Sequence, residues 1–451
     1  MYKVTNPATG EVLEEFPTAT DAEITGAIDR AHQGYLAWRE RPVAERAALV
    51  KRAAELFAER ADELAAIITT EMGKRIAESK GELGIVVDIF SYYADNAEKL
   101  LADEALPIRG GEATIRKSPI GVLLGIMPWN FPYYQVARFA APNLVLGNTI
   151  LLKHAPSCPR SSAAIEALLR DAGLPADAYI NVYATNEQVA DIIADPRVQG
   201  VSLTGSERAG AAVAAEAGKH LKKVVLELGG SDPMIILDTA DIDRMVKIAT
   251  RSRLGNTGQA CNAPKRMIVM SDIHDAFVDK LVASFQGFTP GDPADPATTL
   301  APLSSQGAAD RLIEQIDAAV AQGATVRAGG RRIEGPGAYV EPTVLTGVEP
   351  GTRAYAEELF GPVAMVFKAE SEDEAVELAN DTPFGLGSGV FSADPERARR
   401  VGERIEAGMV FINQAGGSQA DLPFGGVKRS GVGRELGPLG IEEFMNKKVI
   451  K

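Results

Sequence analysis

The sequence predicts an α/β protein with two doubly wound parallel sheets. Five short apolar segments alternate with amphipathic helical segments between residues 121 and 228, and the same alternation returns between residues 234 and 412. Short apolar strands that alternate with helices are typical of parallel sheets whose two faces are both covered. No repeat with a period of about 20–50 residues is visible, which argues against a repeat architecture.

The composition is that of a soluble globular protein. The 451 residues are 45% hydrophobic and 24% charged, and the length alone suggests about three domains. The net charge of −14 disfavours nucleic acid or an anionic membrane as a partner. Two cysteines form no disulfide framework and indicate a reducing compartment. Because no leader and no apolar run of about 18 residues is visible, we expect a cytoplasmic protein.

The first hundred residues have a helical pattern. Asp21–Trp38 and Val43–Met72 are amphipathic, with Asp21 as the expected N-cap of the first helix, and a helical pattern returns at Ser79–Ala102. We expect this region to contribute packing only.

Polar residues follow the strands of the first predicted sheet. The expected strands are Gly121–Ile126, Asn148–Lys153, Tyr179–Tyr183, Val198–Leu203 and Lys222–Leu228, and the helices between them are Tyr133–Leu146, Ser161–Asp171, Glu187–Ala194 and Ser206–Ala217. In parallel sheets, ligands bind beyond the carboxyl ends of the strands. Asn130, Lys153, the Thr204–Ser206 segment and Glu227 lie at these ends. We therefore expect a ligand site along this edge.

A second sheet is expected from the C-terminal half. Its strands are Met234–Leu237, Arg266–Met270, Val363–Phe367, Ser388–Phe391 and Met409–Ile412, and its helices are Ile242–Arg253, Ala276–Phe285, Ala308–Gln322, Glu372–Ala379 and Pro395–Ile405. Pro290–Leu300 and Ala324–Glu341 are rich in turn-forming residues and are expected to be loops.

A turn punctuated by glycines presents one of the two cysteines. The segment from Gly255 to Cys261 reads GNTGQAC and follows an apolar helical segment. Its glycines, at 255 and 258, allow close approach of the backbone, and such turns can aim N–H groups at an anion. A thiolate presented in this way is a nucleophile for a carbonyl carbon. On composition alone, a single cysteine is more often a small buried hydrophobe.

The usual dinucleotide fingerprint is absent. No Gly-x-Gly-x-x-Gly follows a strand, and no Walker lysine follows the glycine-flanked segment between Gly205 and Gly210, which opens a predicted helix. By itself, this segment also fits an ordinary tight helix start.

Five short blocks resemble the signature blocks of the aldehyde dehydrogenase superfamily in their order and spacing. They are Met127–Pro132 (MPWNFP), Glu227–Gly230 (ELGG), Gly258–Cys261 (GQAC), Glu358–Pro362 (ELFGP) and Pro423–Lys428 (PFGGVK). The resemblance implies an aldehyde dehydrogenase-like α/β fold with a Rossmann-like cofactor-binding domain (1–102 and 118–226) and a catalytic domain (227–428). It also implies a small β oligomerisation flap (103–117 and 429–451), and hence a homodimer or homotetramer.

The resemblance assigns the oxidation chemistry to three residues. Cys261 would attack the aldehyde to form a thiohemiacetal, whose oxyanion the Asn130 amide and the Cys261 backbone N–H would stabilise. Glu227 would be the general base that hydrolyses the resulting thioester, since its apolar surroundings raise its pKa. From the residues alone, Asn130 equally fits a turn cap, and Glu227 equally fits a strand-surface ion pair with Lys222 or Lys223.

The resemblance also implies a nicotinamide cofactor. Gly205, Ser206 and Gly210 would hold its pyrophosphate at a helix N-terminus. Glu358 and Phe360 match the residues that hold the nicotinamide ribose and pack beside the ring. Trp129 is also expected to be a cofactor-binding residue, although a role in packing alone would equally account for a tryptophan at this position. Lys153 would bind the adenosine ribose.

Cofactor choice depends on the residues after Lys153. NAD-selective members of the superfamily commonly carry a glutamate three positions later, where this chain has Pro156 followed by Ser157. Losing that carboxylate removes repulsion against a 2′-phosphate, and Ser157 can donate a hydrogen bond to one. We predict NADP, with NAD as the alternative. Four histidines and two cysteines without ligand spacing predict no metal site.

Within the superfamily, His154–Pro156 and Leu228–Pro233 are most similar to the short bacterial members that oxidise succinate semialdehyde to succinate. Arg138 and Ser418 match the residues that bind the substrate carboxylate in that group. A second arginine of many longer members lies six residues before the nucleophile, at a position that is Gly255 here.

Three other interpretations stay open. The chain could act on another small aliphatic aldehyde or semialdehyde. It could be a non-redox acyl enzyme that uses Cys261 and Glu227 to form and hydrolyse thioesters, which would leave Lys153 and Glu358 unexplained. It could also be a catalytically retired binding protein, although such a protein would be free to lose Cys261 and Glu227.

Overall fold

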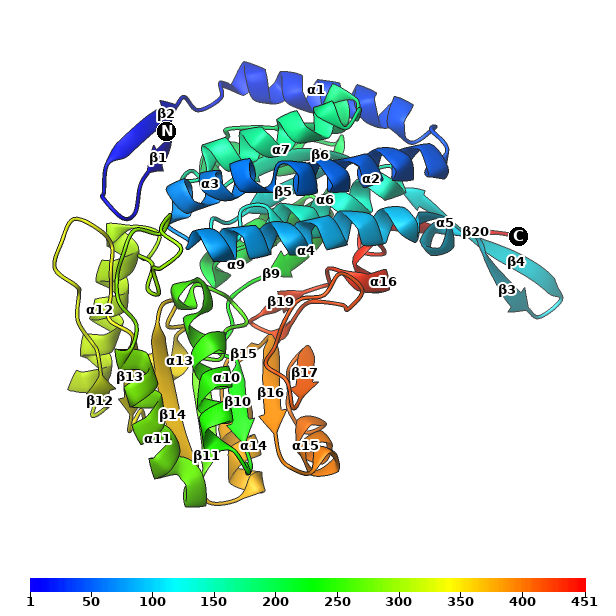
Figure 1. Cartoon of the computed structure of the whole chain (residues 1–451). Helices are drawn as coiled ribbons and strands as arrows, with labels where there is room; N and C mark the ends of the chain where they lie inside the picture. Colours follow the sequence, from blue (N-terminus) through cyan, green and yellow to red (C-terminus); the bar gives the residue numbers. More distant parts are fainter.

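The first parallel sheet orders the N-terminal half of the chain, in a computed structural model that describes residues 1–451 (Figure 1). Its strands are β5 (Val122–Met127), β6 (Thr149–His154), β7 (Tyr179–Asn181), β8 (Val198–Thr204), β9 (Lys223–Glu227) and β19 (Gly431–Val432). The order is β19-β9-β8-β5-β6-β7, and all neighbours are parallel except β19, which is antiparallel to β9. The five predicted strands therefore form a doubly wound sheet.

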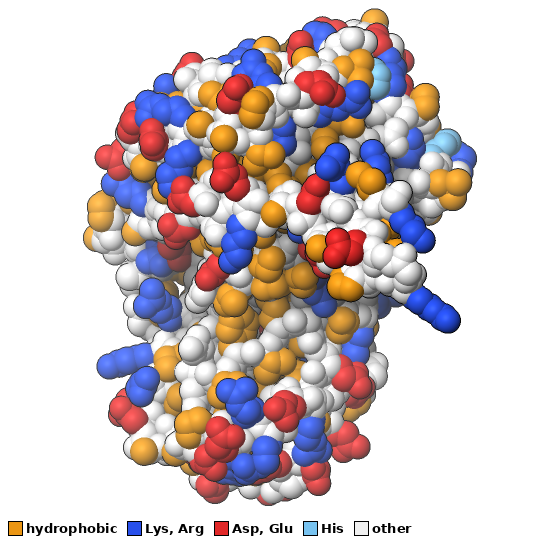
Figure 2. Space-filling model, turned by 90° about the vertical axis from the view of Figure 1, so that its right-hand side faces the viewer, with side chains coloured by type: hydrophobic (Ala, Val, Ile, Leu, Met, Phe, Trp, Pro, Cys, Tyr) orange, Lys and Arg blue, Asp and Glu red, His pale blue; other side chains and the backbone are white.

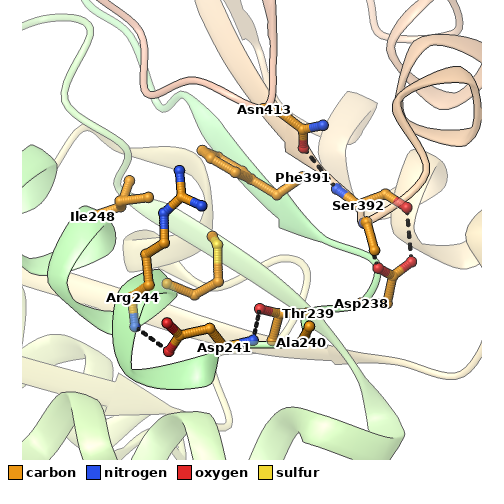
Figure 3. A pocket seen from close by; sticks show the side chains of 11 residues that line it. Asp238, Thr239, Ala240, Asp241, Arg244, Ile248, Phe391, Ser392 and Asn413 are labelled. Atoms are coloured by element: carbon orange, nitrogen blue, oxygen red, sulfur yellow. Dashed lines mark hydrogen bonds between the residues drawn. The ribbon is translucent and has the colours of Figure 1, made fainter.

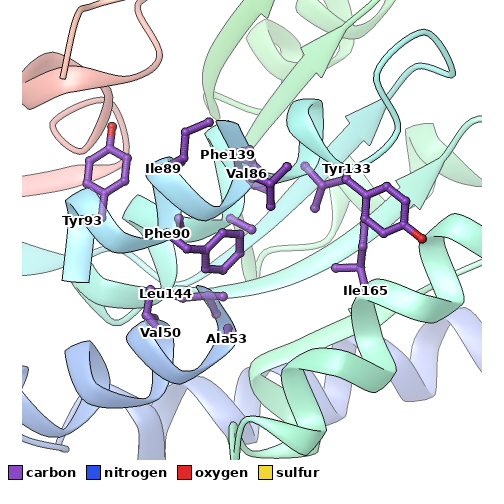
Figure 4. Packing of buried hydrophobic residues seen from close by; sticks show 14 of the residues in the cluster. Val50, Ala53, Val86, Ile89, Phe90, Tyr93, Tyr133, Phe139, Leu144 and Ile165 are labelled. Carbon is purple, nitrogen blue, oxygen red and sulfur yellow. The ribbon is translucent and has the colours of Figure 1, made fainter. Parts of the chain in front are cut away.

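Helices cover both faces of this sheet (Figure 1). They are α1 (Asp21–Trp38), α2 (Val43–Glu59), α3 (Ala61–Met72), α4 (Ile76–Asp95), α5 (Ala97–Leu101), α6 (Tyr134–Leu146), α7 (Pro159–Asp171), α8 (Asn186–Ala194) and α9 (Glu207–Lys219). Figure 4 shows the core that α2, α4 and α6 share. It places Phe90 of α4 among Val50 and Ala53 of α2 and Leu144 of α6, all of them buried. The burial of these apolar faces holds α6 against the sheet at β5.

One helix cap and one helix boundary differ from the sequence prediction. Thr20, not Asp21, is the N-cap of α1, because the Thr20 side chain accepts from the Glu23 N–H while Glu23 accepts from the Thr20 N–H. This reciprocal pair is a capping box. The predicted helix Val43–Met72 is broken at Arg60, whose backbone leaves the helical region at φ −104° and ψ 19°.

The second sheet orders the C-terminal half. Its strands are β10 (Pro233–Ile236), β11 (Arg266–Met270), β12 (Thr325–Ala328), β13 (Thr343–Thr346), β14 (Val363–Ala369), β16 (Gly387–Phe391) and β17 (Met409–Ile412). The order is β12-β13-β14-β11-β10-β16-β17, with β12 alone antiparallel. The prediction that Ala324–Glu341 is wholly a loop is wrong at β12, which pairs at the edge of the sheet where few apolar residues are needed.

The helices of this half are α10 (Ile242–Leu254), α11 (Ser271–Gln286), α12 (Gln306–Ala321), α13 (Arg353–Ala356), α14 (Glu372–Asn380) and α15 (Pro395–Gly402). The short 3₁₀ turn η2 (Gly255–Gly258) directly follows α10, and another, η1 (Ala176–Ala178), precedes β7. The strand pair β15 (Phe384–Gly385) and β18 (Val427–Lys428) lies near the junction of the two halves (Figure 1).

A three-stranded sheet projects from the body and holds the C-terminus (Figure 1). It consists of β3 (Glu104–Ile108), β4 (Gly111–Pro119) and β20 (Met445–Ile450), in the antiparallel order β20-β4-β3. These segments match the core of the predicted flap. The stretch after residue 428 does not belong to it entirely, because β19 pairs with β9 and the short helix α16 (Gly437–Gly440) packs on α6.

The first residues form a hairpin that the sequence did not predict. It consists of β1 (Tyr2–Thr5) and β2 (Val12–Phe16), and the Tyr2 hydroxyl donates to the Ala184 carbonyl at 2.7 Å. Seen from the side, the two halves meet at a waist where hydrophobic side chains gather (Figure 2). None of the helices has the length and apolar character needed to cross a membrane.

Candidate active site

The turn that carries Cys261 has an unusual backbone. Asn256 (φ 51°, ψ 35°), Thr257 (φ 52°, ψ 36°) and Gly258 (φ 73°) are three consecutive residues in the left-handed region. A β-branched residue such as Thr257 rarely adopts this conformation, which costs about 1–3 kcal/mol and occurs where surrounding contacts impose it. The turn is therefore held by its neighbours and not by local preference.

Hydrogen bonds from several elements impose this turn. The Asn256 N–H donates to the Glu78 carboxylate at 3.0 Å, and the Asn256 side chain donates to the carbonyl oxygens of Asn130 and Gln259. The Thr257 hydroxyl donates to the Ala301 carbonyl at 3.2 Å. These bonds tie the turn to α4, to the loop after β5 and to the loop before α12.

The two glycines of the turn have different roles. A Cβ on Gly258 would lie 2.1 Å from the Gly361 carbonyl oxygen, so this position needs glycine for close approach as well as for its positive φ. Gly255 has an ordinary backbone (φ −54°, ψ 134°), and a Cβ there would meet nothing within 4 Å. The expectation that Gly255 also permits close approach is wrong.

Cys261 faces a cavity of about 480 Å³ between the two halves. Burial raises the pKa of its thiol to about 12, while the positive charges of Arg138 and Lys265 act in the opposite direction. Its backbone N–H donates to no protein acceptor and is free to bind a ligand oxygen. The other cysteine, Cys158, is completely buried, and burial raises the pKa of its thiol well above the usual value.

Asn130 lies beside the cysteine turn, as the family resemblance predicts. Its side-chain amide donates to the Gln259 carbonyl at 3.1 Å, two residues before Cys261, and its own carbonyl accepts from Asn256. The structure thus places the Asn130 amide against the turn that carries Cys261, although the two segments come from different halves of the chain. A primary amide has two N–H groups, so one remains for a ligand.

Lys265 is a central residue that the sequence analysis did not identify. Its Nζ donates to the carbonyl oxygens of Ala260 (2.7 Å) and Cys261 (2.5 Å) and lies 2.9 Å from the Glu358 carboxylate. The Lys265 side chain is fully buried, and burial raises the pKa of Glu358 while Lys265 lowers it. The ion pair joins the cysteine turn to the Glu358 loop. The only feature of the sequence that could have indicated this role is that a lysine directly precedes the apolar strand β11.

A second buried cation, Arg253, binds the same two segments. Its guanidinium donates to the Val363 and Leu359 carbonyls, at 2.5 and 2.8 Å, and to the Gly258 carbonyl at 3.2 Å. Burial lowers its pKa to about 9. Together, Arg253 and Lys265 fix the cysteine turn against the loop that bears Glu358.

Glu227 ends β9 and is buried without a hydrogen-bond partner on either carboxylate oxygen. Burial raises its pKa well above the usual value, and the charge of Arg138 partly opposes this rise. A Cβ on Gly425 would lie 2.7 Å from its Oε1, so the carboxylate points toward that loop. The ion pair with Lys222 or Lys223, the alternative explanation of Glu227, does not form. Glu227 does not line the Cys261 cavity in this conformation.

Arg138 does not line the cavity either. It is 1% exposed, and its Nε lies 2.7 Å from the Glu435 carboxylate. Its guanidinium also stacks over the Phe424 ring at 4.4 Å and donates to the Tyr134 hydroxyl at 3.4 Å. In this conformation Glu435 compensates the charge of Arg138, and the predicted direct contact with a substrate carboxylate stays a prediction. No local pattern in the sequence indicates that Glu435 lies against Arg138 of α6.

Ser418 does line the cavity. Its hydroxyl accepts from the Tyr134 hydroxyl at 2.6 Å, and Tyr134 in turn accepts from Arg138. Arg138 thus reaches the cavity only through the Tyr134 hydroxyl. Tyr134 was not among the predicted site residues, and nothing in its position distinguished it from the apolar face of the helix.

The predicted cofactor residues share the carboxyl edge of the first sheet. Lys153 is 6% exposed at the end of β6, and the only hydrogen bond of its ammonium group is one of 3.4 Å to the Asn186 side chain. Ser206 is the exposed N-cap of α9, where its side chain accepts from the Ala209 N–H. A Cβ on Gly210 would lie 2.6 Å from Leu228, so this glycine lets α9 pack on the sheet. Gly205 donates its N–H to the Glu227 carbonyl.

The remaining predicted residues flank this edge. Trp129 and Phe360 pack edge to face at 5.8 Å and, with Glu358, line a separate cavity of about 320 Å³. Pro156 is exposed and Ser157 half-buried in the loop after Lys153. No carboxylate lies within salt-bridge distance of Lys153. No three His, Cys, Asp or Glu side chains gather in a way that could hold a metal ion.

Comparison with known proteins agrees with this geometry. The model of the aldehyde dehydrogenase family matches residues 1–450. The chain belongs to the aldehyde dehydrogenase family.

Several relatives are similar over their whole length. The NADP(+) succinate-semialdehyde dehydrogenase of Deinococcus radiodurans is 56% identical over 450 residues, which covers 100% of this chain and 94% of the relative. The NADP(+) succinate-semialdehyde dehydrogenase of Mycolicibacterium paratuberculosis is 47% identical, covering 99% and 95%. Succinic semialdehyde dehydrogenase from Streptococcus pyogenes, solved in complex with NADP+, is 45% identical with a TM-score of 0.98, covering 100% and 99%.

The fold alone does not distinguish substrates. Betaine aldehyde dehydrogenase from Staphylococcus aureus, in complex with NAD+, is only 32% identical but still has a TM-score of 0.96, covering 99% of this chain and 90% of the relative. The fold class predicted from the sequence is confirmed. The substrate must be argued from the cavity and from the degree of identity.

Proposed function

We propose that this chain oxidises succinate semialdehyde to succinate with NADP as the electron acceptor. The observation that carries the proposal is the hydrogen bond from the Asn130 amide to the turn of Cys261, which lines a cavity, together with a sheet edge that has available cationic and N-cap groups. The full-length identity to proteins with this activity supports the choice of substrate.

Cys261 acts as the nucleophile in this proposal. Its thiol must lose a proton as sulfur attacks the aldehyde carbon, and the raised pKa makes this step costly in the free enzyme. The positive charges of Arg138 and Lys265 reduce that cost because they stabilise the thiolate. The second N–H of the Asn130 amide and the Cys261 backbone N–H then stabilise the oxyanion.

The residues of the sheet edge fit an NADP molecule. Lys153 has a nearly free ammonium group, the N-terminus of α9 suits a pyrophosphate, and the Pro156–Ser157 loop has no carboxylate to repel a 2′-phosphate. Glu358 and Phe360, fixed by Lys265 and packed on Trp129, would hold the nicotinamide end. When bound, the nicotinamide accepts a hydride from the aldehyde carbon.

Glu227 acts as the general base for the final hydrolysis. Its oxygens have no partners, so the side chain is free to turn from Gly425 toward the thioester carbon at Cys261. Its raised pKa makes the carboxylate a better proton acceptor for water. The thioester then yields the carboxylate product and the free thiol.

We also propose that the flap joins two or more copies of the chain in the cytoplasm. β20 is an edge strand of the three-stranded sheet, and its Val449 and Ile450 side chains are 62% and 41% exposed. An exposed edge strand with apolar side chains is a natural surface for pairing. Both cysteines are free, which suits a reducing compartment.

A kinetic panel tests the proposal. Initial rates are measured for succinate semialdehyde, butanal and betaine aldehyde, each with NADP and with NAD. The proposal requires the highest kcat/KM for succinate semialdehyde with NADP. A higher kcat/KM for butanal would reassign the substrate, and absence of any cofactor reduction would favour a non-redox thioester enzyme or a binding protein.

A further inference from the structure

We infer that Arg251 binds the substrate carboxylate at the mouth of the Cys261 cavity. The inference rests on the proposed function, since it concerns a substrate with an aldehyde at one end and a carboxylate at the other. Arg251 lies in the last turn of α10, is exposed, and lines the same cavity as Cys261.

The charged side chains of the cavity wall compensate one another, with one exception. Lys74 forms a fully buried ion pair with Glu82. Glu78 pairs with Arg75 through both carboxylate oxygens, at 2.8 and 3.0 Å. Arg251 has no ion pair and no side-chain hydrogen bond. It is the one uncompensated charge on the wall.

The other nearby cations are committed to structural roles. Arg138 is held by Glu435, as described above, and does not line the cavity. Lys74 is also held over the Phe131 ring at 3.8 Å, and its partner Glu82 accepts from the N–H groups of Tyr133 and Tyr134 at the start of α6. Moving either cation toward a substrate would leave a carboxylate buried without a partner, which costs several kcal/mol. Arg251 can bind an anion without that penalty.

The position of Arg251 suits a bifunctional substrate. Gly255, four residues later at the C-cap of α10, also lines the cavity, and no side chain occupies the space beside it. Cys261 and the exposed Arg251 thus line one cavity, and the Arg251 guanidinium has no protein partner there. A guanidinium offers a planar pair of N–H donors that matches a carboxylate.

The contact predicts a change in substrate binding with little change in chemistry. The carboxylate is remote from the reacting carbon and keeps its charge throughout, so its contact stabilises ground state and transition state alike. Arg251→Ala should therefore raise KM for succinate semialdehyde about 10- to 100-fold and change kcat less than about threefold. Butanal, which has no carboxylate, should show no change in KM.

The same helix provides a matched control. Arg244 is an exposed arginine in the first turn of α10, and it lines a different cavity of about 300 Å³ with Asp241 and Phe391 (Figure 3). Arg244→Ala removes an arginine from the same helix and leaves the Cys261 cavity intact. It should leave KM for succinate semialdehyde unchanged. Arg251→Lys should retain part of the affinity because it keeps the charge but not the planar pair of donors.

Gly255 allows a rescue experiment. Its backbone is ordinary and an added Cβ would meet nothing within 4 Å, so a side chain can be introduced there without backbone strain. The double variant Arg251→Ala/Gly255→Arg should recover most of the lost affinity for succinate semialdehyde. A role of Arg251 in helix stability alone would not be rescued in this way.

Alkylation of Cys261 gives a readout that needs neither NADP nor an aldehyde. Iodoacetate carries a carboxylate and iodoacetamide does not. The ratio of their alkylation rates therefore measures how strongly a nearby cation attracts the carboxylate reagent. Arg251→Ala should lower this ratio by about three- to tenfold relative to wild type and to Arg244→Ala. An unchanged ratio, or equal changes in KM for succinate semialdehyde and butanal, would overturn the inference. Failure of wild type to oxidise succinate semialdehyde would instead refute the proposed function.

Discussion

The turn that carries Cys261 and the sheet edge that carries Lys153 and Ser206 use their polar groups in opposite ways. In the turn, the side chains of Asn256, Gln259 and Lys265 are bound to neighbouring protein groups. At the edge, Lys153 has one long hydrogen bond, and Ser206 is exposed. The first region is fixed before any ligand arrives, whereas the second keeps its groups available.

This difference assigns the two halves different tasks. Nucleophilic attack depends on geometry, so the left-handed turn at Asn256 and Thr257 is imposed by bonds from three other segments. Cofactor binding depends on unsatisfied donors and charge, which the edge supplies. Changes in the turn should therefore affect kcat, and changes at the edge should affect cofactor affinity.

The largest effect should come from the nucleophile. Cys261→Ala should reduce kcat about 10⁴-fold or more, because no other thiol faces the cavity, and should leave the dissociation constant of NADP unchanged. Fluorescence titration and steady-state rates measure the two quantities. The matched variant Cys158→Ala changes the other, fully buried cysteine and should retain activity. Comparable losses in both variants would argue against the assignment.

Glu227→Gln should have the second-largest effect, a loss in kcat of about 10²- to 10³-fold. The pre-steady-state burst of NADPH should remain, because the base acts only after hydride transfer. The base acts only when deprotonated, and burial raises its pKa. In wild type, the hydrolysis rate should therefore increase as the pH rises through this raised pKa. That increase should be lost in the variant, where residue 227 no longer titrates. Stopped-flow traces across pH check both points, and a missing burst would contradict the assigned role.

Lys265→Met should reduce kcat by about 10- to 100-fold and lower the melting temperature. It leaves the Glu358 carboxylate without its partner and frees the Ala260 and Cys261 carbonyls. The double variant Lys265→Met/Glu358→Gln should recover stability but not activity, because the cysteine turn stays untied. Recovery of activity together with stability would mean that Lys265 only neutralises Glu358.

Pro156→Glu should give the smallest effect, a rise in the KM for NADP of about tenfold with little change for NAD. A carboxylate in this loop would repel a 2′-phosphate but not a 2′-hydroxyl. Steady-state titration of both cofactors at fixed aldehyde measures the shift. Equal changes for both cofactors would place the 2′-phosphate elsewhere on the edge.

Much of the fold follows from local patterns in the chain. Strand β11 and helix α1 begin and end at the predicted residues, because buried apolar positions recur with the periods of a strand and a helix. Short edge elements such as β12 and the hairpin of β1 and β2 were not predicted. β12 depends on its pairing with β13, and the hairpin is held by hydrogen bonds from Tyr2 and Lys3 to residues more than 150 positions away. Such contacts leave little pattern in the elements' own residues.

The residues of the candidate site were likewise predictable only where they belong to a local motif. Cys261, Asn130 and Glu227 could be chosen because each lies in a short motif with its own chemistry. Lys265 and the Arg138–Glu435 pair could not, because their importance arises from contacts across the fold, including a pair separated by nearly three hundred residues. Long-range charge pairing has no local signal in one sequence.

The central claim is that Cys261 forms a covalent thioester during oxidation. The most direct test mixes Glu227→Gln with succinate semialdehyde and NADP, quenches the mixture in acid, and locates the adduct by peptide mass spectrometry. The account predicts a succinyl thioester on the peptide that contains Cys261, in an amount equal to the NADPH burst. An NADPH burst with an unmodified Cys261 peptide, or an adduct on Cys158, would contradict it.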